Sequence, residues 1–227
     1  MIHNKKPVVF CDYDGTATEH DVIQMVLEQF ARPGWQAIVR QILDDRTLSI
    51  KDGIIELFRM LPGDQRDAMH RFVIENVKLR PGFEDFLTFC NARGIPFLVV
   101  SGGVDFLIDP ILQPYREKLS VYCNTSRFYP DRIELDLPYY DENCITCDGC
   151  ACCKIKIMNQ YPAADYFRIV IGDSLTDLAS ARQADWVFAR SRLIDYAYED
   201  SLAVTPFETF YEIKNALADK LSEVSYV

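Results

Sequence analysis

Residues 8–17 of the chain read VVFCDYDGTA, an apolar run that leads directly into two aspartates, a glycine and a threonine. A short run that is apolar on both faces is typical of a strand buried in a parallel sheet. Asp12 and Asp14 follow this run with one residue between them. Two unit charges about 4 Å apart repel by roughly 4 kcal/mol at an effective dielectric near 20. The stretch therefore predicts a buried strand whose end carries carboxylates that need a cation.

Similar apolar runs recur along the chain, at 96–100, 167–171 and, more weakly, 186–189. Helical patterns cover 83–93, 175–184 and 207–223, and Gly94 can end the first of them. Strands that alternate with helices predict an α/β fold. We expect a doubly wound, Rossmann-like sheet that is mostly parallel.

No strand pattern interrupts the chain between the first two predicted strands. The segments EHDVIQMVLEQFA, GIIELFRML and AMHRFVIENV all show apolar residues at helical spacing. The interval is too long for a simple crossover. We therefore predict a helical cap at 19–78, inserted into a catalytic core formed by 1–18 and 79–227. Residues 119–153 hold two more strand-like pieces, SVYCN and RIELDLP, and a cysteine-rich loop.

The overall composition suits a soluble globular protein, with 49% hydrophobic and 26% charged residues in a chain of 227. The formal net charge of −10 and the lack of a basic cluster argue against a nucleic-acid partner. No apolar run approaches the roughly 20 residues that span a membrane. The first residues meet charge too early for a signal peptide, so we expect a cytoplasmic protein with reduced cysteines.

Polar motifs follow three of the predicted strands. They are Asp12-Tyr13-Asp14-Gly15-Thr16, Ser101-Gly102-Gly103 and Gly172-Asp173-Ser174-Leu175-Thr176-Asp177, and Lys154 precedes the last at a predicted helix start. Each motif alone has an ordinary explanation, such as an Asx turn, a loop, a helix cap or a surface lysine. Sites in open α/β sheets lie beyond the carboxyl ends of strands, so the motifs together predict one crevice. Carboxylate oxygens there suit Mg²⁺, and Lys154 adds positive charge for a phosphate.

The four motifs, in this order, resemble those of the haloacid dehalogenase superfamily. The resemblance implies that Asp12 attacks phosphorus and forms an aspartyl-phosphate. Asp14 would protonate the leaving oxygen and then deprotonate the water that hydrolyses the intermediate. Members that are not phosphatases tend to replace this second acid, so Asp14 favours a phosphatase.

The same resemblance implies the remaining site residues. Ser101 and the Gly102 amide would hold phosphate oxygens, and Lys154 would neutralise both the nucleophile and the phosphate. Magnesium would bind the Asp12 carboxylate, the Asp14 backbone carbonyl and Asp173. Asp177 would lie near the metal waters or Lys154.

The early helical insertion resembles the cap of the phosphoserine-phosphatase-like group. LSIKDGI at 48–54, VSGGVDF at 100–106, VYCN at 121–124 and the CxxCxxCxCCK segment ending at Lys154 resemble one methionine-salvage branch of it. The resemblance implies hydrolysis of a small enol phosphate with a methylthio tail. It leaves the oligomeric state open, a homodimer included.

Two other functions remain open at this point. Phosphoserine would need charged partners for its amino-acid end, and Glu19 and Arg59 are available. A methylthio tail would instead need an apolar pocket, which Met25, Phe58 and Met60 could supply unless they form the cap's core. A non-catalytic phosphate- or metal-binding module is the other possibility, although binding alone needs no Asp14.

Five of the eight cysteines lie within ten residues, at Cys144, Cys147, Cys150, Cys152 and Cys153. A reduced loop without a ligand, a disulfide and an iron–sulfur cluster are all compatible with this spacing. The sharper hypothesis is a structural Zn²⁺ held by Cys144, Cys147, Cys150 and either Cys152 or Cys153. Such a site would fix the position of the adjacent Lys154.

Overall fold

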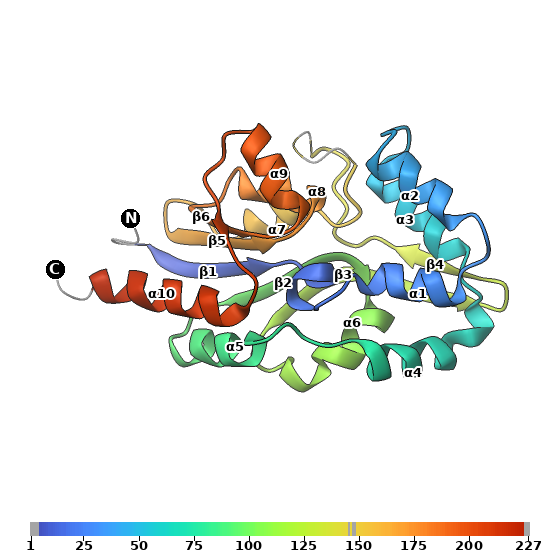
Figure 1. Ribbon diagram of the computed structural model, residues 1–227, viewed down its shortest axis with the longest axis horizontal. Helices are drawn as coiled ribbons and strands as arrows, with labels where there is room; N and C mark the ends of the chain where they lie inside the picture. Colours follow the sequence, from blue (N-terminus) through green and yellow to red (C-terminus); the bar gives the residue numbers. More distant parts are fainter. Residues whose placement is uncertain (1–4, 145, 147–148, 225–227) are drawn as a thin grey trace.

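The computed structural model describes residues 5–144, 146 and 149–224. Within them, seven strands form one sheet in the order β4-β3-β2-β1-β5-β6-β7 (Figure 1). The strands are β1 Lys6–Cys11, β2 Phe97–Val104, β3 Ser120–Tyr129, β4 Arg132–Asp136, β5 Tyr166–Gly172, β6 Trp186–Ala189 and β7 Thr205–Pro206. All neighbouring strands are parallel except β3 and β4. The predicted fold class is therefore confirmed.

Helices cover both faces of this sheet. They are α5 Phe83–Ala92, α6 Asp105–Leu112, α7 Lys154–Met158, α8 Leu175–Ala181, α9 Arg192–Glu199 and α10 Phe210–Val224. Val8 and Phe10 of β1 share a buried cluster with side chains of α7, α8 and α9, whereas Val9 and Cys11 belong to the cluster of α5 and α10. Figure 1 shows these two helical layers on opposite sides of the sheet. Alternating side chains of each strand thus enter two different cores, which explains the continuous apolar runs.

One predicted strand end is wrong. The sequence places the end of the second strand before Ser101, whereas β2 continues through Ser101, Gly102 and Gly103 to Val104. The register with β3 shifts between Val100 and Val104, which marks a bulge in this segment. Two glycines carry no side chain that would signal a strand, so the pattern alone suggested a loop. By contrast, Gly94 ends α5 as predicted, with φ of 64°.

The described chain forms four α-helices between residues 19 and 78: α1 Val22–Phe30, α2 Trp35–Leu43, α3 Ile50–Arg59 and α4 Arg66–Asn76. Short 3₁₀ segments occupy Gly63–Gln65 and Gln113–Tyr115. The side chains of Asp21 and Ser49 cap α1 and α3 by accepting from Gln24 N and Asp52 N. Figure 1 shows these helices around β4 at one end of the molecule, where α3 packs against β4 and α4 packs against α6. That they form a separate cap domain stays a prediction.

The chain enters and leaves this helical insertion through two adjacent segments. Thr18 and Leu79 form an isolated antiparallel bridge. Glu19 N donates to Lys78 O at 3.0 Å, and Arg80 N donates to Ala17 O at 2.8 Å. The insertion is therefore joined to the sheet directly beside the residues that follow β1. None of the helices in the described part of the chain combines the length and the apolar composition of a membrane span.

Candidate functional site

The predicted motifs meet at the carboxyl edge of the sheet. Asp12 follows β1, Ser101 lies in the last half of β2, and Asp173 follows β5. β1 pairs with β2 on one side and with β5 on the other. Because parallel strands end at the same edge, all three residues reach one place, as the sequence predicts.

The turn that follows β1 positions the first two aspartates of the site. Residues Tyr13–Ala17 form one wide helical turn in which Asp14 and Gly15 leave helical geometry, and Gly15 takes a φ of 74°. Thr18 closes the turn, because its Oγ1 accepts from Gly15 N at 3.1 Å and donates to Tyr13 O at 2.9 Å. Tyr13 is completely buried beneath it. The turn thus places Asp12 and Asp14 over the sheet edge on a rigid backbone.

Lys154 is the buried cation of the site. It is the first residue of α7, where the Cys153 side chain caps the helix by accepting from Lys156 N. Its Nζ donates to Asp12 Oδ1 at 2.6 Å and to Asp177 Oδ1 at 2.5 Å. Burial lowers the pKa of Lys154, but attraction to Asp12 and Asp177 outweighs burial and raises that pKa overall. The ammonium therefore stays charged between two carboxylates.

Asp177 organises the loop after β5. Its Oδ2 accepts from the backbone amides of Asp173 and Ser174 at 3.0 and 3.1 Å, in a capping box at the start of α8. Gly172 makes room for it, since a Cβ there would lie 2.3 Å from Asp177 Cγ. Both Asp177 oxygens thus have protein donors, which leaves Asp12 and Asp173 as the more available carboxylates.

Asp12, Asp173 and Asp177 can each place one oxygen within 4.8 Å of the others. Three carboxylates and the Lys154 ammonium have a formal charge of 1 − 3 = −2. Burial and then the negative charge of neighbouring groups raise the pKa of Asp173 to about 8. Burial also raises the pKa of Asp12 to about 7, although the positive charge of Lys154 lowers it. Asp173 Oδ1 is buried and has no hydrogen-bond partner among the described residues. This hard-oxygen set with excess negative charge fits a divalent cation such as Mg²⁺.

Asp14 is held by residues of β2 and α1, whereas Lys154 contacts Asp12 and Asp177. Ser101 Oγ donates to Asp14 Oδ2 at 3.3 Å, and Val22 N donates to Asp14 Oδ1 at 3.2 Å. Ser101 Oγ also accepts from Gly103 N at 2.9 Å. Burial, followed by the charges of Asp21 and Asp12, raises the pKa of Asp14 well above its usual range. A carboxyl group that keeps its proton is able to act as a general acid.

A cavity lies over these residues. Its floor is formed by Asp12, Asp14, Asp173, Ser174, Gly102 and Gly103. Asp21, Thr176 and four apolar residues complete it: Ile23 of α1, Ile50 and Ile54 of α3, and Ala151. Among the described residues that line it, none is basic. The sequence gives no local signal for Asp21 or the apolar wall, because only the packing of the insertion over the sheet brings them here.

Two arginines that the motifs do not include hold the turn in place. Arg80 is buried and donates from Nε to Thr16 O and from Nη2 to the carbonyls of Gly15, Thr18 and Glu19, at 2.8 to 3.2 Å. Arg190 Nη1 also donates to Gly15 O at 2.6 Å. Burial and the nearby Arg190 charge lower the pKa of Arg80. Arg80 thereby ties the base of the insertion to the turn that carries Asp14.

Several candidate specificity residues lie elsewhere. Glu19 and Arg59 do not line the cavity, and Arg59 is exposed. Phe58 is fully buried and Met25 packs against the same hydrophobic cluster, so both contribute to the core. Met60 does not line the cavity either. The apolar surface near Asp12 thus comes from isoleucines rather than from the methionines and the phenylalanine.

The predicted zinc site is not supported. Cys147 lies outside the described residues, and among the residues that are described the acidic triad is the only group of three or more possible metal ligands. Cys150, Cys152 and Cys153 are buried. Besides the Cys153 cap, the segment contacts the insertion, since Lys51 N donates to Gly149 O at 2.8 Å. This hydrogen bond joins the cysteine segment to α3 of the insertion.

Comparison with protein families gives a match over residues 9–182 to the haloacid dehalogenase-like hydrolases. A protein of Brevibacillus brevis described as 2-hydroxy-3-keto-5-methylthiopentenyl-1-phosphate phosphatase is 43% identical, and the alignment covers 97% of this chain and 99% of the relative. The protein of the same description from Geobacillus thermodenitrificans is 40% identical, with 94% and 96% covered.

Solved structures of phosphoserine phosphatase share the fold. A phospho-aspartyl intermediate analogue matches with a TM-score of 0.63 at 17% identity, covering 93% of this chain and 99% of that one. A substrate-bound complex matches with a TM-score of 0.68 at 16% identity, covering 93% and 98%. At this identity the likeness concerns the fold alone.

Proposed function

Because this chain belongs to the haloacid dehalogenase-like hydrolases, we propose that it is a Mg²⁺-dependent phosphatase of methionine salvage. Its substrate is 2-hydroxy-3-keto-5-methylthiopentenyl-1-phosphate, and its products are 1,2-dihydroxy-3-keto-5-methylthiopentene and phosphate. Relatives described as the phosphatase of this substrate, 40–43% identical over nearly the whole chain, support the substrate. The clustered carboxylates beneath a partly apolar cavity support the chemistry.

Asp12 is the proposed nucleophile. One carboxylate oxygen attacks phosphorus in line with the ester oxygen, so that an O–P bond forms to Asp12 as the bond to the leaving group breaks. Lys154 at 2.6 Å orients Asp12 and partly offsets the rise in its pKa that burial causes, and Asp177 holds the other side of Lys154. The Gly102 amide and Ser101 are the proposed phosphate ligands. Gly102 lines the cavity, and a Cβ on it would meet nothing within 4 Å, so phosphate can approach its backbone closely.

Asp14 is the proposed general acid and base. Its raised pKa keeps a proton available for the departing enol oxygen. After that transfer the carboxylate removes a proton from water, which attacks the aspartyl-phosphate and releases phosphate. The hydrogen bonds from Ser101 and Val22 fix its position between the sheet and the insertion.

The Asp12 and Asp173 carboxylates and the Asp14 backbone carbonyl would hold Mg²⁺. The ion would neutralise charge on the transferring phosphate, as metal ions do in phosphoryl transfer. Asp177 would hold the loop after β5, and with it Asp173, in place through its hydrogen bonds to the Asp173 and Ser174 amides.

The side chains that line the cavity over Asp12 favour one class of substrate. Phosphoserine presents a carboxylate at the end away from phosphate, and buried carboxylates need a cationic or multiple hydrogen-bonding partner. No lysine or arginine lines the described cavity, whereas Ile23, Ile50 and Ile54 present apolar surface. A substrate with a thioether tail suits this wall better than an amino acid does.

The decisive experiment compares kcat/KM for the enol phosphate, generated in situ by the enzyme reaction that forms it, with kcat/KM for phosphoserine. We expect the enol phosphate to be preferred by at least about a hundredfold, the effect of roughly 2.7 kcal/mol in transition-state binding. Preference for phosphoserine would overturn the proposed substrate.

A protein that binds phosphate and Mg²⁺ but hydrolyses neither ester nor para-nitrophenyl phosphate would be a binding module instead. A cytoplasmic location and a homodimer are further proposals, for cell fractionation and sedimentation to test.

A further inference from the structure

Asn124 is a buried polar residue that the proposed mechanism does not use. It ends the VYCN segment in β3, and its side chain is completely buried. Its Nδ2 donates to Gly102 O at 2.8 Å, whereas its Oδ1 is buried without a hydrogen-bond partner among the described residues. Burying a polar group costs free energy unless it is hydrogen-bonded. Packing alone would favour an apolar side chain here, so the hydrogen bond to Gly102 needs an explanation.

This hydrogen bond reaches a bulge in β2. The strand pairs on either side of the bulge are Val100–Tyr122 and Val104–Asn124. Residues 101–103 of β2 therefore lie opposite Cys123 alone. Extra residues in a strand leave the ladder of backbone hydrogen bonds and bend the strand locally. Gly102, in the middle of the bulge, lines the cavity over Asp12. The bulge thus exposes backbone of β2 to the proposed phosphate position, and the Asn124 side chain holds a carbonyl within it.

The peptide between Gly102 and Gly103 is held on both sides. Its carbonyl accepts from Asn124 Nδ2, and its N–H, on Gly103, donates to Ser101 Oγ at 2.9 Å. Because a trans peptide is planar and its C=O and N–H point in opposite directions, the two bonds fix its orientation. Glycine turns more readily than any other residue, and a Cβ on Gly102 would meet nothing within 4 Å. Packing therefore does not hold this peptide, and the bond from Asn124 selects one orientation.

Ser101 extends this network to the proposed general acid. Its Oγ accepts from Gly103 N and donates to Asp14 Oδ2 at 3.3 Å. A hydroxyl has a single proton to donate, so its direction depends on where the Gly103 amide lies. Asn124 is thus connected, through one peptide and one hydroxyl, to both proposed phosphate ligands and to Asp14.

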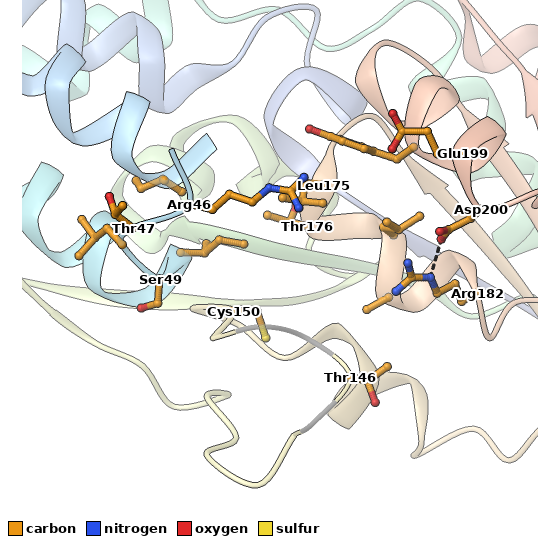
Figure 2. A pocket seen from close by; sticks show the side chains of 16 residues that line it. Arg46, Thr47, Ser49, Thr146, Cys150, Leu175, Thr176, Arg182, Glu199 and Asp200 are labelled. Atoms are coloured by element: carbon orange, nitrogen blue, oxygen red, sulfur yellow. Dashed lines mark hydrogen bonds and ion pairs between the residues drawn. The ribbon is translucent and has the colours of Figure 1, made fainter. Parts of the chain in front are cut away.

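We propose that Asn124 is a positioning residue of the phosphatase: its side-chain amide holds the Gly102–Gly103 peptide so that the Gly102 amide and the Ser101 hydroxyl lie toward the phosphate. Asn124 lines neither the cavity over Asp12 nor the larger cavity beside α8 whose lining side chains Figure 2 shows. It therefore acts through Gly102 and Ser101 and does not touch the substrate. The proposal rests on the proposed function for the position of phosphate over Asp12.

Asn124→Leu tests this proposal, because leucine has nearly the same shape as asparagine but cannot donate a hydrogen bond. With para-nitrophenyl phosphate as substrate, the Ki of inorganic phosphate should rise by at least about tenfold, as expected when a hydrogen bond to a charged group is weakened. Misplacement of the phosphate ligands should lower kcat/KM by about a hundredfold. Mg²⁺ without phosphate should stabilise the variant against heat as much as the parent, because Asp12 and Asp173 follow β1 and β5 rather than β2. A general loss of structure would weaken both phosphate and Mg²⁺ binding.

Asn91→Leu is the matched control. Asn91 Nδ2 also donates to a backbone carbonyl, that of Lys118, but this residue precedes β3 at the amino edge of the sheet. The control should keep the phosphate Ki of the parent. Asn124→Ala removes the same donor without adding apolar bulk, so it should show the same loss as Asn124→Leu, and either variant that folds is decisive. A phosphate Ki equal to that of the parent, or an equal loss of Mg²⁺ stabilisation, would overturn the positioning role.

A measurement on the parent itself needs no folded variant at position 124. Selective ¹⁵N labelling gives amide signals from the ten glycines, and Gly102→Ala identifies the signal of Gly102. Phosphate with Mg²⁺ should shift this signal in the parent and shift it less in Asn124→Leu. A Gly102 signal that phosphate leaves unshifted in the parent would overturn the proposal. Failure of the parent to hydrolyse para-nitrophenyl phosphate would overturn the phosphatase function, whereas turnover with an unchanged Ki in the Asn124 variants refutes only the positioning role.

Discussion

Gly15 and Asp173 approach so closely that a Cβ atom on Gly15 would lie 2.6 Å from Asp173 Oδ2. Gly15 also has a φ of 74°, in the left-handed region that side chains disfavour. The two residues come from loops after β1 and β5, which are neighbours in the sheet. The turn after β1 therefore reaches directly onto a proposed metal ligand, and only glycine leaves room for both.

Gly15→Ala should displace the Asp173 carboxylate and raise the Mg²⁺ concentration needed for half-maximal activity by at least about tenfold, which corresponds to roughly 1.4 kcal/mol. Gly94→Ala is the matched control. Its φ is 64°, but an added Cβ would meet nothing within 4 Å. It should lose about 1 kcal/mol of unfolding free energy and keep the Mg²⁺ dependence of the parent. Equal Mg²⁺ dependence in the two variants would show that the contact with Asp173 is unimportant.

Arg80→Lys should weaken the turn that carries Asp14, because a lysine cannot replace a guanidinium that donates to four carbonyls between residues 15 and 19. Each buried carbonyl left without a donor costs about 1–3 kcal/mol. We expect lower stability in urea unfolding, together with a higher KM and weaker Mg²⁺ binding.

Arg168→Lys is the control for that loss. Arg168 is equally buried and its Nε donates to Tyr161 O, but it pairs with Val8 toward the amino end of β1, away from the site. It should lose stability with normal KM and Mg²⁺ binding. If Arg80→Lys behaved in the same way, Arg80 would be a structural residue with no positioning role.

Asp173→Asn should abolish most of the stabilisation that Mg²⁺ gives the parent, which is about 2.7 kcal/mol at a hundred times Kd. Without metal the variant should be at least as stable as the parent. The folded-state pKa of Asp173 is raised from 3.8 to about 8, so the folded parent holds a proton that the unfolded chain has released. Through this group, metal-free stability falls as pH rises from about 4 to about 8. Thermal unfolding at pH 6 and 8, with and without Mg²⁺, measures both effects, and an unchanged Mg²⁺ shift would exclude Asp173 as a ligand.

Asp14→Asn should remove the proton needed by the leaving group. A general acid contributes about 10²- to 10⁴-fold to the rate. The deficit should be large for alkyl phosphates, whose alkoxide leaves poorly, and small for para-nitrophenyl phosphate. An equal deficit for good and poor leaving groups would refute the acid role.

Much of the fold followed from local patterns. The first, third and fourth predicted strands match β1, β5 and β6 because their side chains enter cores on both faces and so leave continuous apolar runs. The polar motifs predicted after the first three strands meet at one edge, because parallel strands end at the same edge of a sheet. The predicted second strand ends before the glycines of β2, because a glycine has no side chain from which the pattern could indicate a strand.

The parts of the site that could not be predicted depend on tertiary packing. Arg80 lies in KLRPG, where nothing distinguishes a buried clamp from a surface arginine. Ile23 belongs to an apolar helical stripe that predicts a core position, yet it lines the cavity over Asp12. Asp21 gives the signal of a helix cap, and it is one, but it also faces that cavity. These roles depend on which face of the insertion packs toward the sheet. The sequence pattern does not predict that packing.

The central claim is that Asp12 becomes phosphorylated, and chemical trapping tests it most directly. The enzyme is mixed with substrate and Mg²⁺ for less than one turnover, quenched and treated with borohydride, which reduces an acyl phosphate to an alcohol and expels phosphate. Peptide mass spectrometry should then find homoserine at position 12. Asp12→Asn keeps an acceptor oxygen for Lys154, so it should still bind phosphate and Mg²⁺ yet show neither homoserine nor measurable turnover. Full release of phosphate by the parent with Asp12 unmodified, or with the modification on another residue, would contradict the account.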